Sequence, residues 1–372
     1  MNPTQRPLIM QRWNVLQHDL LPEIKQQCGS LTPKLEKLIH ILDWVRIEEF
    51  VSDQWQGIGR KPHDRGALAS AFIAKAVLGL NTTAALIERL TMDRSLKRLC
   101  GFEMWKEVPN EATFSRAFGE FAQAKLAEKV HEALIKSYLG DSLIGHISRD
   151  GTAIAAREKP KKHMKVVSVE KAQKQRRGRP KKGEIRPPKE EKVTKIGWQL
   201  TQTLPSIVNA LPKECDRGTK CNAQGYKVSW NGYKLHIDTA DCGVAISALL
   251  TSASVHDSQT AVPLATMTAA RVTNLYDLMD AAYCSEELRA HSKSLGHVPL
   301  IDHNARGGEK KPFAPHEQQR YKERTQAERT NGRLKDEFGG TTVRVRGSEK
   351  VMSHLMFGLL VLTADQLMRL FT

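Results

Sequence analysis

The amino-acid sequence predicts a helical N-terminal domain followed by a mixed domain of the α+β or α/β class that carries a basic insertion. Three observations predict this fold class. Apolar residues recur at helical spacing between residues 31 and 140, β-forming runs alternate with helical runs after residue 226, and a basic stretch separates the first β-forming run from the others. The chain has 372 residues, which is enough for two or three folded units.

The charge balance of the chain predicts a polyanionic partner. The formal net charge is +16 at pH 7, and the pI is near 9.6. Such an excess of Lys and Arg repels itself unless phosphates or acidic lipids neutralise it, and nucleic acid is the first candidate. The 6 cysteines are scattered and no secretory signal is visible, which predicts a cytoplasmic location.

Helical patterns fill the N-terminal third of the sequence. Thr32 and Pro33 are typical of an N-cap and a first turn, and apolar residues follow at helical spacing up to Val45. Further helices are expected at residues 67–80 and 83–90, and in a long run from Glu111 to Gly140.

A strand and then a basic insertion are expected after Gly140. The β-forming residues predict a strand that ends at Asp150, where a glycine comes next. The stretch from Arg157 to Lys195 holds 16 Lys and Arg against 5 Asp and Glu, a balance of +11. Its prolines and its lack of aromatic residues are typical of a segment that cannot bury a core. We therefore expect a mobile insertion, with order resuming at about Tyr226.

The rest of the chain alternates strands with helices. Residues 226–238 and 244–251 predict paired strands, with Asn231 and Gly232 as a turn inside the first run. A helix, a strand, a helix and a strand are expected next, at residues 258–271, 274–280, 285–295 and 297–302. This alternation indicates a sheet that is at least partly parallel.

A charged helix and an apolar helix are expected to end the chain. The longest apolar run of the last helix, Leu355–Leu362, is far shorter than the ~20 residues that cross a bilayer. We therefore expect a buried helix and no membrane partner.

Three acidic residues fall where this arrangement could bring them together. Asp150 and Asp280 each follow a predicted strand and precede small residues, so both could line one crevice. Glu328 lies in the charged helix, and its spacing places it on one helical face with Tyr321, Arg324 and Lys335. Taken singly, each acid is more often a solvated residue or a salt-bridge partner, and Glu328 could simply pair with Arg324.

Taken together, these motifs resemble the acidic-triad (DDE) transposases of bacterial insertion sequences. The resemblance rests on Asp150-Gly151-Thr152, on Asp280-Ala281-Ala282-Tyr283, and on a Y-x2-R-x3-E-x6-K pattern at Tyr321, Arg324, Glu328 and Lys335. Residues 109–118, 232–238 and 250–258 are similar to further segments of the family, so the likeness covers roughly residues 60–365. It implies an RNase H-like (retroviral integrase-like) catalytic core.

The resemblance also implies a metal-dependent reaction on DNA. Asp150, Asp280 and Glu328 would hold two Mg²⁺ ions, which Mn²⁺ could replace, while water or a DNA 3′-hydroxyl attacks a phosphodiester bond. Arg324 and Lys335 would fix the scissile strand, and Tyr321 would bond a phosphate or stack on a base. The expected partners are double-stranded DNA, namely the terminal inverted repeats of the element and the target, bound by a homodimer that holds two ends together.

Two other acids near the core are expected to have structural roles. Asp257 is expected to cap the helix that starts near Ser258. Asp277 precedes Asp280 by three residues, an odd offset that turns the two side chains to opposite faces of a strand.

The basic insertion contains a run that looks like a minor-groove hook, in which an extended Arg-Gly-Arg enters a narrow A·T groove. Its basic residues are Arg176, Arg177, Arg179, Lys181 and Lys182. The alternative is a solvated charge run with weak phosphate affinity.

Two other functions stay open on the sequence: a nuclease or resolvase that cuts without joining, and a catalytically idle DNA-binding regulator. Acids that face DNA weaken phosphate binding, which argues against the idle regulator. The expected units are an N-terminal tail (1–30), a helical DNA-binding domain (31–140), the first strand of the core (141–156), the basic, partly disordered insertion (157–225), the rest of the core (226–350) and an apolar C-terminal helix (351–372).

Overall fold

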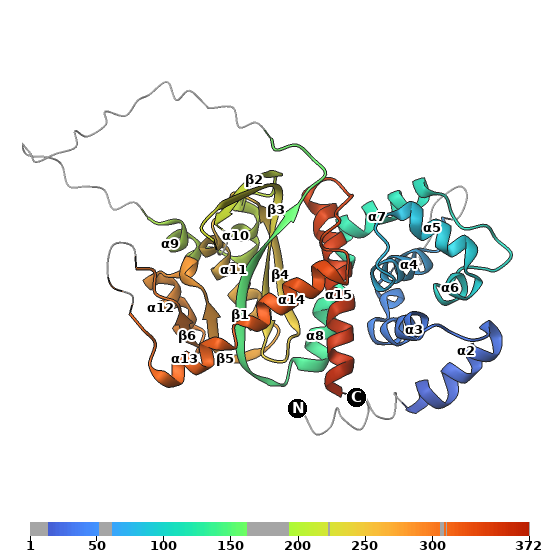
Figure 1. Cartoon of the computed structure of the whole chain (residues 1–372), viewed down its shortest axis with the longest axis horizontal. Coiled ribbons are helices and arrows are strands. Elements are labelled where there is room, and N and C mark those ends of the chain that lie inside the picture. Colours follow the sequence, from blue (N-terminus) through green and yellow to red (C-terminus); the bar gives the residue numbers. More distant parts are fainter. Residues whose placement is uncertain are drawn as a thin grey trace, which may run out of the picture.

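The computed structural model describes residues 14–51, 62–161, 193–221, 224–305, 309 and 311–371. A group of N-terminal helices lies beside a six-stranded sheet, and a long C-terminal helix runs between the two (Figure 1). The described chain is therefore a mixed α+β protein.

The N-terminal part is helical, as the periodicity predicts. Its helices are α2 (Leu21–Cys28), α3 (Pro33–Val45), α4 (Arg65–Val77), α5 (Thr83–Met92), α6 (Arg94–Leu99), α7 (Glu111–Ala124) and α8 (Leu126–Leu139), with a π-helical turn at Leu16–Leu20 and a 3-10 turn at Ile47–Phe50. Side chains of Thr32, Asp64, Thr82, Asp93 and Asn110 cap α3 to α7 by accepting a backbone N–H bond. Part of the expected tail is thus helical.

The predicted single helix from Glu111 to Gly140 is wrong. It is two helices, because Lys125 adopts a left-handed backbone conformation (φ 52°) that ends α7. The chain then turns and α8 packs back against α7.

The sheet is mixed. Its strands are β1 (Leu143–Ala155), β2 (Asp216–Cys221), β3 (Lys227–Ala240), β4 (Ala245–Ser252), β5 (Thr273–Met279) and β6 (Val298–Ile301). Strand β3 pairs antiparallel with β1, β2 and β4, whereas β1 with β5 and β5 with β6 are parallel pairs. The partly parallel sheet that the alternation predicts is present.

Helices cover both faces of the sheet. They are α9 (Lys195–Leu200), α10 (Leu204–Ala210), α11 (Ala261–Ala269), α12 (Glu286–Ser294), α13 (Pro315–Lys322), α14 (Thr325–Asp336) and α15 (Ser348–Phe371), with 3-10 turns at Asp257–Thr260 and Ala281–Tyr283. Leu249 of β4 packs with Leu264 of α11, whereas its neighbour Leu250 joins the core that contains α15. Successive residues of β4 therefore pack against helices on opposite faces of the sheet.

Two strand predictions are wrong. Strand β1 does not end at Asp150 but pairs with β3 as far as Ala155. Asn231 and Gly232 do not form a turn, since β3 runs through them unbroken. A Cβ on Gly232 would lie 2.1 Å from the backbone oxygen of Ile154, so the glycine permits a close approach of the two strands instead.

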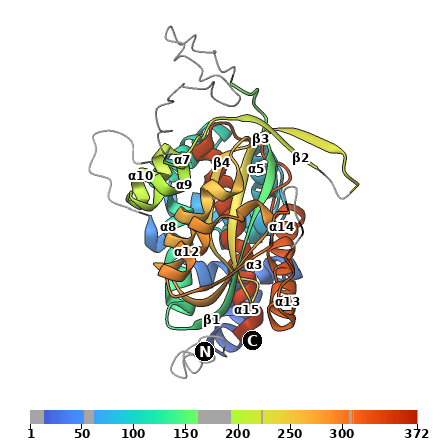
Figure 2. The ribbon, with the colours of Figure 1, turned by 90° about the vertical axis from the view of Figure 1, so that its left-hand side faces the viewer.

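Order resumes earlier than Tyr226, because α9, α10 and β2 precede that residue. Thr194 caps α9, and Ile207 and Leu211 are buried in small apolar clusters against the helices of the sheet. These few apolar positions are enough to anchor short helices inside a stretch whose overall composition is polar. Figure 2 shows that β2 and the start of β3 then project from the body as a hairpin.

One hydrophobic core joins the N-terminal helices to the sheet. It includes Leu38, Phe114, Ile147 and Leu235, and α15 packs against α3, α4, α7, α8 and β4. Helix α15 has the length and composition of a membrane span, but 78% of its apolar window is buried inside the protein. It serves as the core helix that the sequence predicts.

Candidate active site

Asp150 and Asp280 lie on neighbouring parallel strands. The register of β1 on β5 pairs Arg149 with Met279, so the two aspartates come next on each chain. Asp280 ends its strand as predicted and caps the following turn, because its Oδ1 accepts the Ala282 N–H at 2.9 Å. The fold thus brings the first two predicted acids together.

A buried ion pair fixes β1 beside Asp150. Arg149 Nε and Nη2 donate to Asp238 Oδ1 and Oδ2, each at 2.8 Å, and the two side chains are 2% and 0% exposed. Thr268 of α11 donates a further bond of 2.7 Å to Asp238. Because strand side chains alternate, Arg149 anchors the α11 face while Asp150 faces α14.

Helix α14 crosses β1 and β3 (Figure 1), and one of its polar side chains contacts Asp150. Asn331 Nδ2 donates to Asp150 Oδ2 at 2.9 Å. Glu328 lies three residues before Asn331 and Lys335 four residues after it, so the three share one face of α14. The Glu328 carboxylate is 54% exposed, however, and accepts a 2.7 Å bond from Arg324 Nη2.

The third acid is therefore not gathered with the first two in this conformation. Among the residues that the structure describes, no group of three His, Cys, Asp or Glu side chains is close enough to hold a metal ion. The ion pair of Glu328 with Arg324 is the local alternative that their spacing allows.

The prediction of one continuous charged helix is wrong. Helix α13 ends at Lys322 and α14 begins at Thr325, with backbone bonds between residues three apart through the junction. The two helices have different supports, because Tyr321 OH donates to Met279 O at 3.2 Å at the end of β5 while α14 packs on β1 and β3. Tyr321 consequently lies on α13, Arg324 lies at the N-cap of α14, and Glu328 and Lys335 lie on α14.

The two aspartates have a shared need for positive charge. Burial raises the pKa of Asp150 to about 6, an effect that Arg324 opposes and the like charge of Asp280 reinforces. Burial also raises the pKa of Asp280, and Asp257 adds to this increase. Asn331 Oδ1 is buried without a hydrogen-bond partner in the described part of the chain. Hard oxygen donors of this kind fit Mg²⁺ or Mn²⁺.

Asp257 is not the helix cap that the sequence predicts. His256 is the capping residue, and its ring Nδ1 accepts the Ser258 N–H at 3.4 Å. Asp257 Oδ1 instead bonds Lys234 Nζ at 2.8 Å and lies 3.8 Å from His236 Nδ1. The His256 imidazole therefore occupies the capping position, and the Asp257 carboxylate pairs with Lys234 instead.

This position makes Asp257 a neighbour of the acidic pair. A Cβ on Gly151 would lie 3.2 Å from Asp257 Oδ1, and Gly151 follows Asp150 directly. Sequence reasoning missed the proximity because β1, β3 and the turn before α11 converge only in the fold.

Asp277, in contrast, has the structural role predicted for it. Its Oδ2 accepts a 2.7 Å bond from Ser292 Oγ and lies 3.1 Å from His297 Nδ1, and the side chain is buried. It points to α12, away from Asp150.

Cations flank the site. Burial lowers the pKa of Lys335, as does Lys220 of the projecting hairpin, while Asp150 opposes the shift. Lys220 is a further cation near Lys335 that the motif did not include. Arg176, Arg177, Arg179, Lys181 and Lys182 lie outside the described residues.

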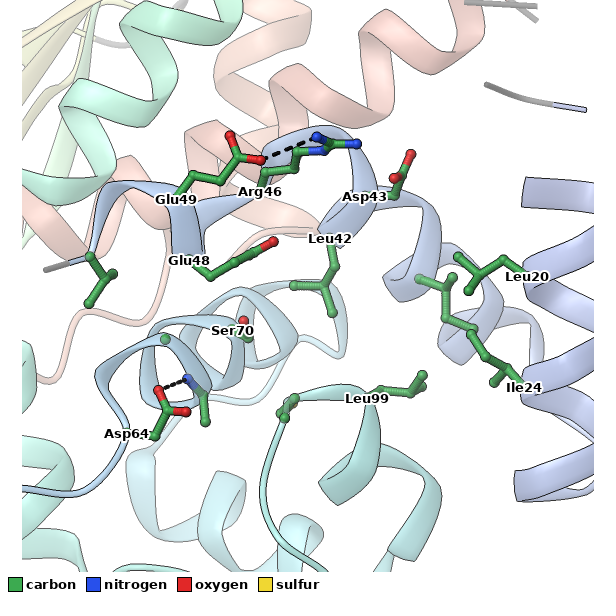
Figure 3. Close-up of a pocket in the computed structure, with 16 residues that line it drawn as sticks. Leu20, Ile24, Leu42, Asp43, Arg46, Glu48, Glu49, Asp64, Ser70 and Leu99 are labelled. Carbon is green, nitrogen blue, oxygen red and sulfur yellow. Dashed lines mark hydrogen bonds and ion pairs between the residues drawn. The ribbon is translucent and has the colours of Figure 1, made fainter. Parts of the chain in front are cut away.

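A cavity of about 700 Å³ lies elsewhere, among the N-terminal helices (Figure 3). Leu20, Ile24, Leu42 and Leu99 form apolar parts of its lining, and its rim carries the 3.2 Å ion pair of Arg46 with Glu49. None of the predicted site residues lines it.

Two family matches divide the chain. Residues 22–120 match a transposase domain (DUF772), and residues 150–364 match the transposase DDE domain. No curated protein and no solved structure matches the chain. The second match begins at Asp150, contains Asp280 and Glu328, and covers more than half of the 372 residues. The chain therefore belongs to the DDE transposases, enzymes that cleave and join DNA.

Proposed function

We propose that this transposase binds the ends of an insertion sequence, cleaves there and joins the ends to target DNA, with Asp150, Asp280 and Glu328 holding two divalent cations. One observation carries the proposal. Asp150 and Asp280 adjoin on parallel strands, and Asp150 faces the helix that carries Glu328.

Bound Mg²⁺ or Mn²⁺ would stabilise the attacking and leaving oxygens of an in-line displacement. Asp150 and Asp280 supply carboxylate oxygens for this purpose, and Asn331 holds Asp150 in orientation. Glu328 would complete the set if its carboxylate, which is 54% exposed, exchanged Arg324 for a cation. The same exchange would release the Arg324 guanidinium for a DNA phosphate.

The flanking residues position the strand to be cut. Lys335 would provide positive charge beside Asp150, and Lys220, which lies near Lys335, would extend that charge along the DNA backbone. The phenol of Tyr321 already donates to Met279 O, and its ring packs on Phe313 with centroids 4.8 Å apart. We assign it the positioning of the strand end that precedes Asp280, with its half-buried ring contacting DNA.

The sheet order supports an RNase H-like core, with antiparallel β4, β3 and β1 followed by parallel β5 and β6. The helices before β1 would then bind DNA. Because two element ends have to be held together, the active form would be a homodimer on DNA in the bacterial cytoplasm.

The segment with Arg176, Arg177, Arg179, Lys181 and Lys182 would add sequence-independent affinity, since the surrounding stretch carries +11 charges. Residues 163–191 can be replaced by a Gly-Ser linker of the same length. The slope of log K against log salt should become shallower by several units, at ~0.9 per lost phosphate contact. An unchanged slope would exclude contact with DNA.

The proposed reaction is tested with a duplex that ends in the terminal repeat and a supercoiled target plasmid. Strand cutting followed by covalent joining to the plasmid, dependent on Mg²⁺ or Mn²⁺, is expected. Cutting without joining would favour the nuclease or resolvase alternative. Binding without either reaction would favour the idle regulator.

A further inference from the structure

A second cavity, of about 510 Å³, is lined by residues of the N-terminal helices, of the segment after β1 and of the start of α15. Five cations line it: Lys75, Arg157, Arg344, Arg346 and Lys350. Glu111 is the one acid among its described lining residues. We call this hollow the basic cavity.

No carboxylate in the described part of the chain pairs with the cations of the basic cavity. None of the five makes an ion pair with a residue that the structure describes, and all but Lys75 have exposed side chains. Like charges around one hollow repel each other, and a bound polyanion relieves that repulsion. An ordinary solvated basic surface would spread such charges or pair them with acids.

The walls of the cavity are held in place. Glu158, directly after Arg157, accepts the Gly347 N–H at 3.1 Å and so ties the segment before α15 to the end of β1. Lys350 lies against α7, because a Cβ on Gly119 would be 3.7 Å from its Cε. The basic residues therefore come from segments that the fold fixes relative to each other.

A helix N-terminus adds to the positive potential. Thr83 and Ala84, the first two residues of α5, line the cavity next to the capping Thr82. The first N–H groups of a helix have no partner within the helix and favour phosphate. From these four features we propose that the basic cavity binds backbone phosphates of the DNA substrate, joining the N-terminal helices and the catalytic sheet to one duplex.

The position of the cavity defines where on the DNA it acts. Arg157 follows Asp150 by seven residues, most of them in β1, so the two Cα atoms are at most about 23 Å apart. At ~3.4 Å per nucleotide along a strand, and with the reach of the side chains added, the contacted phosphates lie within roughly one helical turn of the reacting one. This inference rests on the family's DNA substrate and not on the proposed metal site. Phosphate binding in the basic cavity and metal-dependent cutting at the acids can therefore fail independently of each other.

The test measures binding of an arbitrary 30-base-pair duplex in EDTA, where no cutting occurs. The variant Arg344→Gln/Arg346→Gln/Lys350→Gln should make the slope of log K against log salt shallower by about two to three units, at ~0.9 per phosphate contact. Lys129→Gln/Lys293→Gln, which changes two exposed cations elsewhere, should leave the slope near that of the wild type. Arg157→Gln is a second test variant, in the segment after β1. It should make the slope of log K against log salt shallower by about one unit.

Glu111→Gln should strengthen duplex binding, because it removes the one described acid of the cavity, whereas Glu286→Gln in α12 should not. An unchanged slope in the triple variant, with an unchanged melting temperature, would overturn the proposal. A triple variant that keeps its duplex slope but loses binding of inorganic pyrophosphate would also overturn it, in favour of a small-phosphate site.

Discussion

Asn331 donates a 2.9 Å hydrogen bond to Asp150 from the same helical face that carries Glu328. The donor is the amide nitrogen, so the contact favours the ionised carboxylate and fixes its orientation. The amide oxygen of Asn331 stays buried without a partner in the described chain. Asn331 is thus the residue of α14 that orients Asp150, although the family motif does not contain it.

Replacing Asn331 with Leu should weaken metal binding. Groups that orient a ligand typically contribute 10- to 100-fold in metal affinity, and a fall of that size is expected in a Mn²⁺ titration followed by calorimetry. Thr330→Val, the neighbouring buried residue on α14, is the control, because its hydroxyl bonds Gly243 O and not an acid. Equal Mn²⁺ affinity in the Leu variant and the wild type would show that Asn331 does not orient Asp150.

Asp150→Asn should abolish cutting yet stabilise the metal-free protein. The folded-state pKa of Asp150 is raised to about 6 from 3.8, so its ionisation destabilises the fold as the pH rises towards 6. Removing the charge should add about 1–3 kcal/mol to the free energy of unfolding at pH 8, and about half as much at pH 5, since the penalty builds up between the unfolded and folded pKa values. Thermal melts in EDTA at the two pH values measure the difference.

Asp277→Asn is the matched control, with the opposite sign. Burial would raise the pKa of Asp277, but the hydrogen bond from His297 and the charge of Arg149 lower it overall. Its ionised form therefore contributes stability at pH 8, which the Asn variant loses. If both variants melted at the same temperature, the desolvated-acid account of Asp150 would be wrong.

The three acids stay a proposal, and the sequence singled them out by local signals together with the resemblance to the DDE transposases. Short windows of sequence show both signals. One is a strand followed by a small residue, and the other is the spacing of three, four and seven residues in the Y-x2-R-x3-E-x6-K pattern. What the acids contact could not be found in this way. Asn331 meets Asp150, and Asp257 meets Lys234, across chain separations that no periodicity encodes.

The errors in the predicted fold have a similar origin. Asn231-Gly232 is a turn signal in isolation, but the tertiary need for Gly232 to pass close to Ile154 overrides it. Helices α9 and α10 were hidden because only a few apolar positions, such as Ile207, distinguish them within a basic and polar stretch.

Glu328→Gln should reduce cutting by orders of magnitude without stabilising the metal-free protein. Its carboxylate is 54% exposed and bonds Arg324, so removing its charge relieves no desolvation. Asp150→Asn/Glu328→Gln should cut little less than either single variant, because ligands that act as a unit are not additive. Single-turnover cutting rates with an intact end duplex would measure this. Normal cutting by Glu328→Gln would remove it from the proposed set.

Replacing Asp257 with Asn should shift the pH dependence of metal binding to lower pH. Burial is the main cause of the raised pKa values of Asp150 and Asp280, and the charge of Asp257 adds to both. Since a carboxylate binds a cation only when ionised, Mn²⁺ affinity in the wild type should rise as the pH passes about 6. Without Asp257, and with the Lys234 ammonium no longer paired, that rise should occur at lower pH.

Cutting by Asp257→Asn at pH 8 should stay within several-fold of the wild type, because both aspartates are then ionised in either protein. Glu286→Gln, an exposed acid in α12, controls for the change in net charge. If Asp257→Asn lost Mn²⁺ affinity equally at every pH, Asp257 would be a metal ligand and not a neighbour that tunes the other two.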